Sequence, residues 1–334
     1  MTSRSKVQLK VTKADRLHWS AIGLESCEGG GVQLKPVAGR AARKRPQEDL
    51  AAEARIFVPD EEFFTPMKKP KKSEWLAEHK TEGQPFERFL QGSAKYPTQR
   101  RKVIYLLPLQ FDEAFIPADI LDSLKQFASI FFGMKLKVMK ATSFKGKVPN
   151  RFNKNSNTFQ VHAGKILEEM TSIVPEDAFC VAAITMCDLY PQDSWNFVFG
   201  LAQMRSGCGV YSLARYLSNF GEQPNTVYNP ESETGSNSLM KRACKTMCHE
   251  IGHMFGISHC VYFSCIMNGS NHLEESDERS MFLCPVCLRK LHFICQFEII
   301  ERYKLMSEFW SKFGYEEDSA WLRKRLERLA KGSV

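Results

Sequence analysis

The stretch of sequence that decides the fold class reads His249-Glu250-Ile251-Gly252-His253-Met254-Phe255-Gly256-Ile257-Ser258-His259. His249 and His253 are four residues apart, so on a helix both imidazole rings project from one face, one turn apart. Two ring nitrogens placed in this way suit a single Zn2+ ion. Glu250 lies beside them and can reach a water molecule on that ion, which is the arrangement of the His-Glu-x-x-His peptidases. The short motif therefore predicts a zinc-dependent peptidase site.

The end of the motif makes this prediction more specific. Gly256 can end the helix in the left-handed conformation, which lets His259 reach the same metal from a different direction. Three protein ligands leave a fourth position open, which is typical of a catalytic site rather than a closed structural one. Zinc lowers the pKa of its water to about 7, and Glu250 would take the proton as the water attacks a carbonyl. The pattern indicates a metzincin-type peptidase; the alternative is a helix with surface histidines and no metal.

A second group of candidate ligands is made of cysteines. Seven of the eleven cysteines fall between Cys244 and Cys295. Four of these have ligand spacing: Cys284 and Cys287 form a Cys-x-x-Cys pair, and the other two are Cys260 and Cys265. Four thiolates can close a tetrahedral structural zinc site. The alternatives are a redox pair, which would need Cys-x-x-Cys to open a helix after a strand, or four buried thiols.

The apolar pattern predicts an α/β layer fold with a mixed twisted sheet and an active-site helix. Predicted strands cover 103–107, 136–139, 178–185 and an exposed edge strand at 210–216. Predicted helices cover 120–131, 160–170, 238–256 and most of 297–330, with a break at 316–319 and a short helix near 85–90. Residues 220–238 are rich in Gly, Asn, Pro and Ser and are predicted to form a loop.

Composition divides the chain into three regions. Residues 1–95 carry several basic clusters and few apolar groups, so we expect a poorly ordered basic N-terminal region. Residues 96–310 are predicted to form the metalloprotease domain, and 311–334 a helical C-terminal tail. The net charge of +8 would allow nuclear import or polyanion binding, but no Cys/His or aromatic-interleaved module accompanies it. A nucleic-acid partner is therefore not expected.

Cellular location is predicted from what the sequence lacks. No stretch approaches 18 consecutive apolar residues, and the first residues lack the apolar core of a secretory signal. Cysteines in such a chain point to metal ligands or buried thiols in a reducing compartment. We expect an intracellular protein, cytoplasmic with nuclear entry left open, without a membrane partner. Cys27, Cys180, Cys187 and Cys208 are expected to be small buried side chains.

The whole pattern resembles the archaemetzincin family of zinc metallopeptidases. The resemblance starts from the histidine motif followed at once by Cys260 and extends over roughly 100–305, through the segments 176–180, 188–200 and 269–275. Because the third histidine, His259, is intact, the motif resembles that of the second of the two animal archaemetzincins more than that of the first. The resemblance implies a metzincin-like fold with a zinc-stapled C-terminal subdomain.

The family also implies roles for matching residues, which amount to two zinc ions per chain. His249, His253 and His259 would bind the catalytic zinc, with Glu250 as general base and acid. Cys260, Cys265, Cys284 and Cys287 would bind the structural zinc, and Met267 would be the Met-turn residue. The strand at 210–216 would be the edge that pairs with an extended peptide substrate.

The predicted function is hydrolysis of peptides or small proteins, with an aminopeptidase-like action on small peptides implied by the animal family. The rival hypothesis is a zinc-stabilised interaction protein that keeps the fold and has little turnover. The presence of Glu250 favours the enzyme hypothesis, because a purely structural site needs no carboxylate beside an open zinc position. Arg215, Tyr216 and Tyr211 are candidates to stabilise the oxyanion, with an ordinary surface role as the alternative.

Overall fold

The computed structural model describes the following residues: 18, 20–26, 32–34, 54–111, 115–225, 228 and 238–331. They form two compact units, each built from segments that are distant in sequence. The sheet unit comprises 94–257 and 291–323, and the cysteine unit comprises the described parts of 1–93, 258–290 and 324–334. Cys27 and the basic cluster at 40–45 lie outside the described residues. So does part of the region predicted to be poorly ordered, 1–95; its described part includes the short helices and strands named below.

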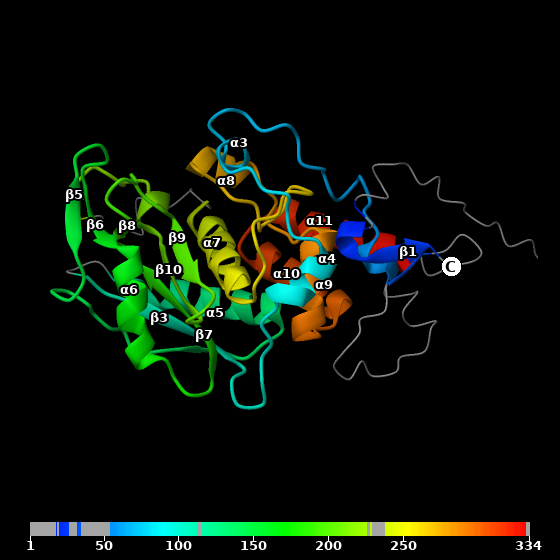
Figure 1. Cartoon of the computed structure of the whole chain (residues 1–334), viewed down its shortest axis with the longest axis horizontal. Helices are drawn as coiled ribbons and strands as arrows, with labels where there is room; N and C mark the ends of the chain where they lie inside the picture. The colour runs from blue at the N-terminus through cyan, green and yellow to red at the C-terminus, as the bar shows by residue number, and fades with distance from the viewer. Residues whose placement is uncertain are drawn as a thin grey trace, which may run out of the picture. The chain divides into compact units, whose positions relative to one another are not determined.

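A five-stranded mixed sheet organises the sheet unit (Figure 1). Its strand order is β4-β3-β7-β10-β9. The bounds are β3 Val103–Leu109, β4 Leu136–Val138, β7 Ala178–Thr185, β9 Gly200–Gln203 and β10 Cys208–Ser212. The first four strands in this order are parallel to one another, and β9 is antiparallel to β10. The predicted mixed α/β sheet is thus confirmed.

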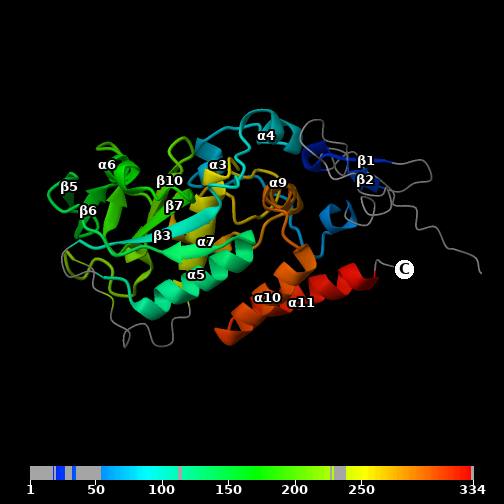
Figure 2. The same cartoon turned by 90° about the horizontal axis from the view of Figure 1, so that it is seen from below.

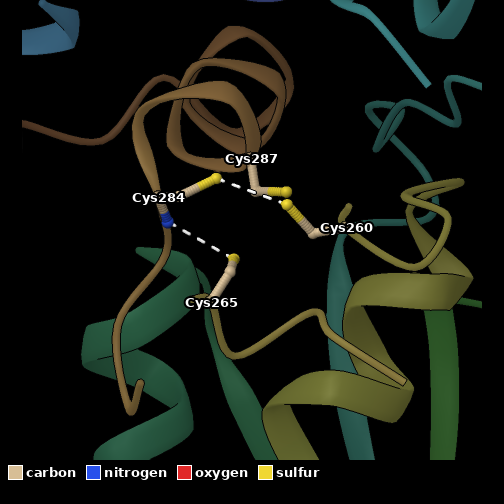
Figure 3. A group of neighbouring side chains, drawn as sticks. All are labelled: Cys260, Cys265, Cys284 and Cys287. Atoms are coloured by element: carbon tan, nitrogen blue, oxygen red, sulfur yellow. Dashed lines mark hydrogen bonds between the residues drawn. The ribbon is translucent and has the colours of Figure 1, made fainter. Parts of the chain in front are cut away.

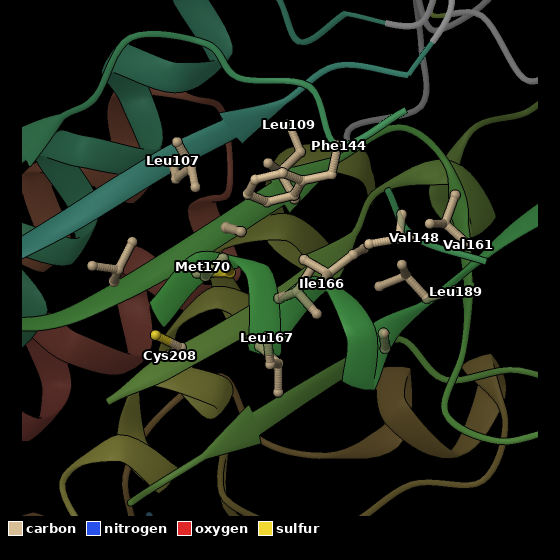
Figure 4. Packing of buried hydrophobic residues seen from close by; sticks show 14 of the residues in the cluster. Leu107, Leu109, Phe144, Val148, Val161, Ile166, Leu167, Met170, Leu189 and Cys208 are labelled. Atoms are coloured by element: carbon tan, nitrogen blue, oxygen red, sulfur yellow. The ribbon is translucent and has the colours of Figure 1, made fainter. Parts of the chain in front are cut away.

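Helices cover both faces of this sheet, which explains why β3 and β7 read as nearly continuous apolar runs. On one face, α6 (Ala163–Met170) contributes Ile166, Leu167 and Met170 to a core with alternate β3 residues such as Leu107 and Leu109 (Figure 4). On the other face, α5 (Ala118–Phe132) and α7 (Ser238–Met254) pack against each other (Figure 2). Alternating β3 side chains therefore enter two separate apolar layers.

Two of the predicted elements were wrong. The segment 210–216 is not the edge of the sheet, because β10 lies between β7 and β9 and is buried throughout. The edge strand is β9, a four-residue strand of mixed composition. The predicted helix at 160–170 begins only at Ala163, since Thr158–His162 forms strand β6.

Strand β6 belongs to a small second sheet of order β5-β6-β8, with β5 at Asn150–Asn153 and β8 at Asp188–Tyr190. Val161 and Leu189 of this sheet join the apolar core, but the sheet also buries polar residues. The buried Gln160 amide donates to Asp188 Oδ2 at 2.8 Å and to the Asn196 carbonyl at 2.9 Å. A buried polar residue is stable here because its hydrogen bonds are satisfied.

The C-terminal helices are α10 (Ile299–Lys312) and α11 (Glu316–Lys331). The break between them comes a few residues before the predicted position, at Gly314, whose φ of +76° is left-handed. Buried Arg302 of α10 donates from Nε to the Phe131 carbonyl of α5 at 2.7 Å. No helix within the described ranges is long and apolar enough to cross a membrane.

The cysteine unit contains short strands and helices, together with parts of α9 and α11. They are β1 (Leu24–Ser26), β2 (Val32–Leu34), α3 (Trp75–Glu78), α4 (Phe86–Gly92) and α8 (Leu273–Glu278), while α9 spans Pro285–Cys295. Helix α4 confirms the short helix predicted near 85–90.

Candidate metal centres

Helix α7 presents His249 and His253 on one face. Their Nε2 atoms lie 2.9 Å apart, and their rings are nearly perpendicular at a centroid distance of 4.5 Å. His253 Nδ1 lies 2.7 Å from the Ile257 carbonyl, so it is the nitrogen that carries the proton and donates it. Burial lowers the pKa of His253. The ring is therefore held neutral with the Nε2 lone pair directed towards its neighbour, the form that binds a metal.

Glu250 is a buried carboxylate, 6% exposed. Burial raises the pKa of Glu250 to about 8. Among the residues that the structure describes, no cationic side chain forms an ion pair with it. Its carboxylate lies against the backbone of Gly200 on edge strand β9, where an added Cβ would come within 2.5 Å of Oε1. A buried carboxylate is costly without a nearby cation, so a metal ion beside it would be favourable.

Gly256 turns the chain directly after α7. Its φ of +91° confirms the predicted left-handed helix end, and the Ile257 N–H donates back to the Gly252 carbonyl at 3.2 Å. Along this eleven-residue stretch His249, His253 and His259 each offer one ring nitrogen, and these nitrogens lie within 4.8 Å of one another. The donor set of three imidazoles fits a zinc ion.

Four buried cysteines converge in the cysteine unit: Cys260, Cys265, Cys284 and Cys287 (Figure 3). Their sulfur atoms lie within 4.8 Å of one another, and the Cys260 and Cys284 sulfurs are 3.6 Å apart. Hydrogen bonds from the other three thiols hold the pKa of Cys260 well below its usual value. Burial raises the pKa values of Cys265 and Cys284 well above the usual value, so a bound cation would be needed to hold those thiols deprotonated. Four sulfurs at this separation fit one tetrahedral ion.

Backbone N–H groups support this sulfur cluster. Cys265 Sγ accepts from Cys284 N at 3.3 Å and from Met267 N at 3.5 Å. Cys284 precedes α9 directly, so the Cys-x-x-Cys pair does open a helix, but residues 279–283 before it form no strand. All four thiols also gather at one point, which argues against an isolated redox pair.

Asn268 is a supporting residue that the motif analysis missed. Its buried side chain accepts from Cys265 N at 2.7 Å and donates to the carbonyls of Cys260 and Phe263 at 2.8 and 3.0 Å. These bonds close the loop that carries two of the cysteines. Met267 is 1% exposed, and its carbonyl accepts from Cys260 N at 2.7 Å. Only the Asn side chain placed three residues after Cys265 could have signalled such a turn.

The candidate oxyanion groups have other roles in the sheet unit. Arg215 makes a bidentate ion pair with buried Asp188, at 2.8 and 2.7 Å, and lies over the ring of Phe197. Tyr216 Oη is 2.6 Å from Thr246 Oγ1, and Tyr211 is fully buried. Arg215 and Tyr216 are thus bound within the fold and Tyr211 is fully buried, so the expected surface role is wrong for these residues.

Comparisons with known proteins agree with this geometry. The family model of peptidase family M54 matches residues 103–293. The chain is 39% identical over 271 residues to "Archaemetzincin-2" of Rattus norvegicus, covering 75% of this chain and 76% of the rat protein. It is 37% identical over 274 residues to "Archaemetzincin-2" of Homo sapiens, with 75% of each chain covered. "Archaemetzincin-1" of Rattus norvegicus is 31% identical, over 71% of this chain and 53% of that protein.

These matches define a zinc metallopeptidase, which is a hydrolase. The chain belongs to peptidase family M54, the archaemetzincins, and is similar to those named Archaemetzincin-2. The resemblance seen in the sequence is thus confirmed. Among solved structures, archaemetzincin from Methanopyrus kandleri is 26% identical, with a TM-score of 0.44 over 60% of this chain and 99% of that chain.

Proposed function

We propose that this chain hydrolyses peptide bonds with a zinc ion held by His249, His253 and His259 and with Glu250 as general base. The observation that carries the proposal is the buried Glu250 carboxylate, which has no ion-pair partner in the described part of the chain and follows directly after a histidine whose Nε2 faces that of His253. When bound, zinc supplies Lewis acidity that polarises a carbonyl and makes water acidic enough to lose a proton near neutral pH.

Glu250 has two tasks in this mechanism. Its carboxylate accepts a proton from the attacking water, which forms the new bond to the carbonyl carbon. The protonated carboxyl then gives this proton to the leaving nitrogen as the C–N bond breaks. Burial supports both tasks, because it raises the pKa of Glu250 towards the working pH.

Edge strand β9 provides a surface for an extended substrate. It is the last strand of the sheet, and its Gly200 backbone contacts Glu250. We propose that the peptide adds to the open side of β9 as a further strand, which would bring its scissile bond past Glu250. Aminopeptidase-like action on small peptides is the specificity that the family resemblance supports.

The second zinc ion is proposed to be structural, held by Cys260, Cys265, Cys284 and Cys287, so that the chain binds two zinc ions. This closed sulfur site would form the zinc-stapled subdomain of a metzincin-like fold, with Met267 as the Met-turn residue. We assign the metalloprotease domain to 96–310 and the helical tail to 311–334. An intracellular location is part of this proposal, since cysteines gathered as candidate metal ligands suit a reducing compartment.

Glu250→Gln tests the catalytic proposal. The variant keeps the side-chain shape but cannot accept the proton, so we expect cleavage of a small-peptide pool to fall by at least about 100-fold while the zinc content stays the same. Glu317→Gln, at an exposed position of α11, is the matched control and should cleave at the wild-type rate. Equal turnover by Glu250→Gln and wild type would contradict the assignment and favour the interaction-protein hypothesis. Assaying peptides with free and with acetylated N-termini tests the proposed aminopeptidase action, which requires a free N-terminus.

A further inference from the structure

Trp75 lies against His259, although it belongs to a region before the part matched by the family model. The two rings are 4.3 Å apart between centroids and meet edge to face at 74°. His259 is in an irregular segment, whereas His249 and His253 are fixed by helix α7. A ring in such a segment has no helical backbone to fix its direction, so neighbouring side chains must do so.

The indole of Trp75 is itself held in place by its surroundings. His79 stacks on it at 4.7 Å with nearly parallel rings. Behind it lies Gly269, where an added Cβ would come within 2.3 Å of the indole Cδ2. Glycine at 269 therefore leaves the space that the large ring fills.

A buried carboxylate holds the backbone of Trp75. Both oxygens of Glu275, 1% exposed, accept from the Trp75 N–H at 3.1 Å. Glu275 also accepts from Asn271 N at 2.8 Å and pairs with Arg279 at 2.8 Å. An ion-paired acceptor with several charge-assisted bonds is a rigid anchor, so α3 is fixed on α8.

The whole segment 65–84, here called the strap, runs along the chain that carries His259. Met67 N donates to the Tyr262 carbonyl at 3.1 Å, and Ser264 N donates to the Thr65 carbonyl at 2.8 Å. At the other end, Gln84 Oε1 accepts from Ser258 N at 3.1 Å, next to His259. The strap therefore makes hydrogen bonds to residues that come both before and after His259 in the sequence.

We propose that Trp75 is a positioning residue for His259 and that the strap makes metal binding depend on residues outside the family-model region. The inference rests on the proposed role of His259 as a metal ligand. Groups that orient a ligand from behind commonly change metal affinity or activity by 10- to 100-fold when removed. An edge-to-face aromatic contact can do this because it fixes the tilt of the imidazole.

Trp75→Leu and Trp75→Phe, made in the full chain, separate this role from simple packing. Both are apolar and keep the backbone N–H that Glu275 binds, but only Phe keeps an aromatic ring. The readouts are zinc affinity by chelator competition and the ligand-field absorption of protein loaded with Co2+. We expect Trp75→Leu to lower the affinity for one of the two zinc ions by about 10-fold or more and to alter the Co2+ absorption. Trp75→Phe should stay near wild type in both readouts. Trp195→Leu, at an exposed tryptophan of the sheet unit, should change neither readout.

Several results would overturn the proposal. Wild-type affinity and absorption in Trp75→Leu would do so, and equal weakening in Leu and Phe would show that the aromatic contact is not the cause. A lower melting temperature with unchanged affinity would reduce Trp75 to a packing residue. His259→Ala is run in parallel: if it keeps both ions, the ligand set itself is wrong. If His259→Ala loses one ion while Trp75→Leu binds both with wild-type affinity, His259 remains a ligand and only the positioning role of Trp75 is rejected.

Discussion

At the scale of single residues, Gly200 controls the space available to Glu250. The glycine sits on edge strand β9, and a methyl group there would lie within 2.7 Å of three atoms of the Glu250 side chain. The buried carboxylate would have to move to make room for this methyl group. A backbone position on a strand thus sets where the proposed general base can lie.

We predict that Gly200→Ala lowers kcat/KM by about 100-fold, because a displacement of about 1 Å in a catalytic group can cost that much. Zinc content should not change, since no proposed ligand is touched. Steady-state peptide cleavage and metal analysis measure the two effects. Gly92→Ala is the matched control: a Cβ at Gly92 meets no atom within 4 Å, so activity should be retained. A Gly200→Ala enzyme with full activity would show that Glu250 tolerates the shift.

Residues of the site differed in how well the sequence predicted them. The three histidines and the four cysteines could be grouped as candidate ligands because helical spacing and knuckle spacing relate residues that are close in sequence. Asn268 and Trp75 could not, because their roles depend on partners fixed only by tertiary structure. Trp75 contacts a carboxylate that lies 200 residues further along the chain.

At the scale of elements, the end of α5 illustrates how a turn and a packing contact coincide. Gly133 caps the helix with φ of +61°, and a Cβ there would lie 2.6 Å from Cβ of Phe297. Two separate costs therefore meet at one residue: backbone strain and overlap with a neighbouring side chain.

Gly133→Ala should lower the free energy of unfolding by roughly 2–5 kcal/mol, which combines left-handed strain with steric overlap. Gly146→Ala isolates the strain: its φ is +77°, but no atom lies within 4 Å of the added Cβ, so only about 1–2 kcal/mol should be lost. Urea unfolding of both variants measures the difference. Equal losses would mean that Phe297 moves aside without cost.

Strands were predictable where burial on both faces made them apolar. Strands β3 and β7 show this pattern, and the sequence placed both within two residues. Strand β6 was not predicted because it contains the polar residue Gln160, which the sequence pattern does not mark as buried. The hydrogen bonds that allow its burial, to Asp188 and Asn196, are visible only in the structure. Strand β9 is four residues long and starts with glycine, so its pairing with β10 rather than its composition defines it.

At the scale of the whole molecule, the two candidate metal centres are joined by a single peptide bond, between His259 and Cys260. Cys260 is fixed by its backbone N–H, which donates to the Met267 carbonyl, and by the Asn268 amide, which donates to the Cys260 carbonyl at 2.8 Å. A change in the sulfur site is therefore passed directly to the third histidine.

Cys284→Ser should reduce bound zinc from two ions to one or fewer and lower the melting temperature, because apparent zinc-binding energies of structural sites are on the order of 10 kcal/mol. Peptidase activity should fall as well, although Cys284 is not part of the catalytic set. Metal analysis, thermal unfolding and cleavage assays test the three effects. Cys295→Ser, in the sheet unit, should keep both ions. Two ions and unchanged stability in Cys284→Ser would contradict the four-sulfur assignment.

The strap also has a consequence for how the chain is made. Trp75 leaves the ribosome about 200 residues before Glu275, the group that holds it. At about 5–20 residues per second, this interval lasts roughly 10–40 s. During that time the indole and the strap backbone have no native neighbours among residues 258–279, and closing so long a loop is entropically costly. The strap therefore cannot help to position the third histidine until residues 258–279 have been made, and apolar surface left exposed during that interval is prone to aggregation.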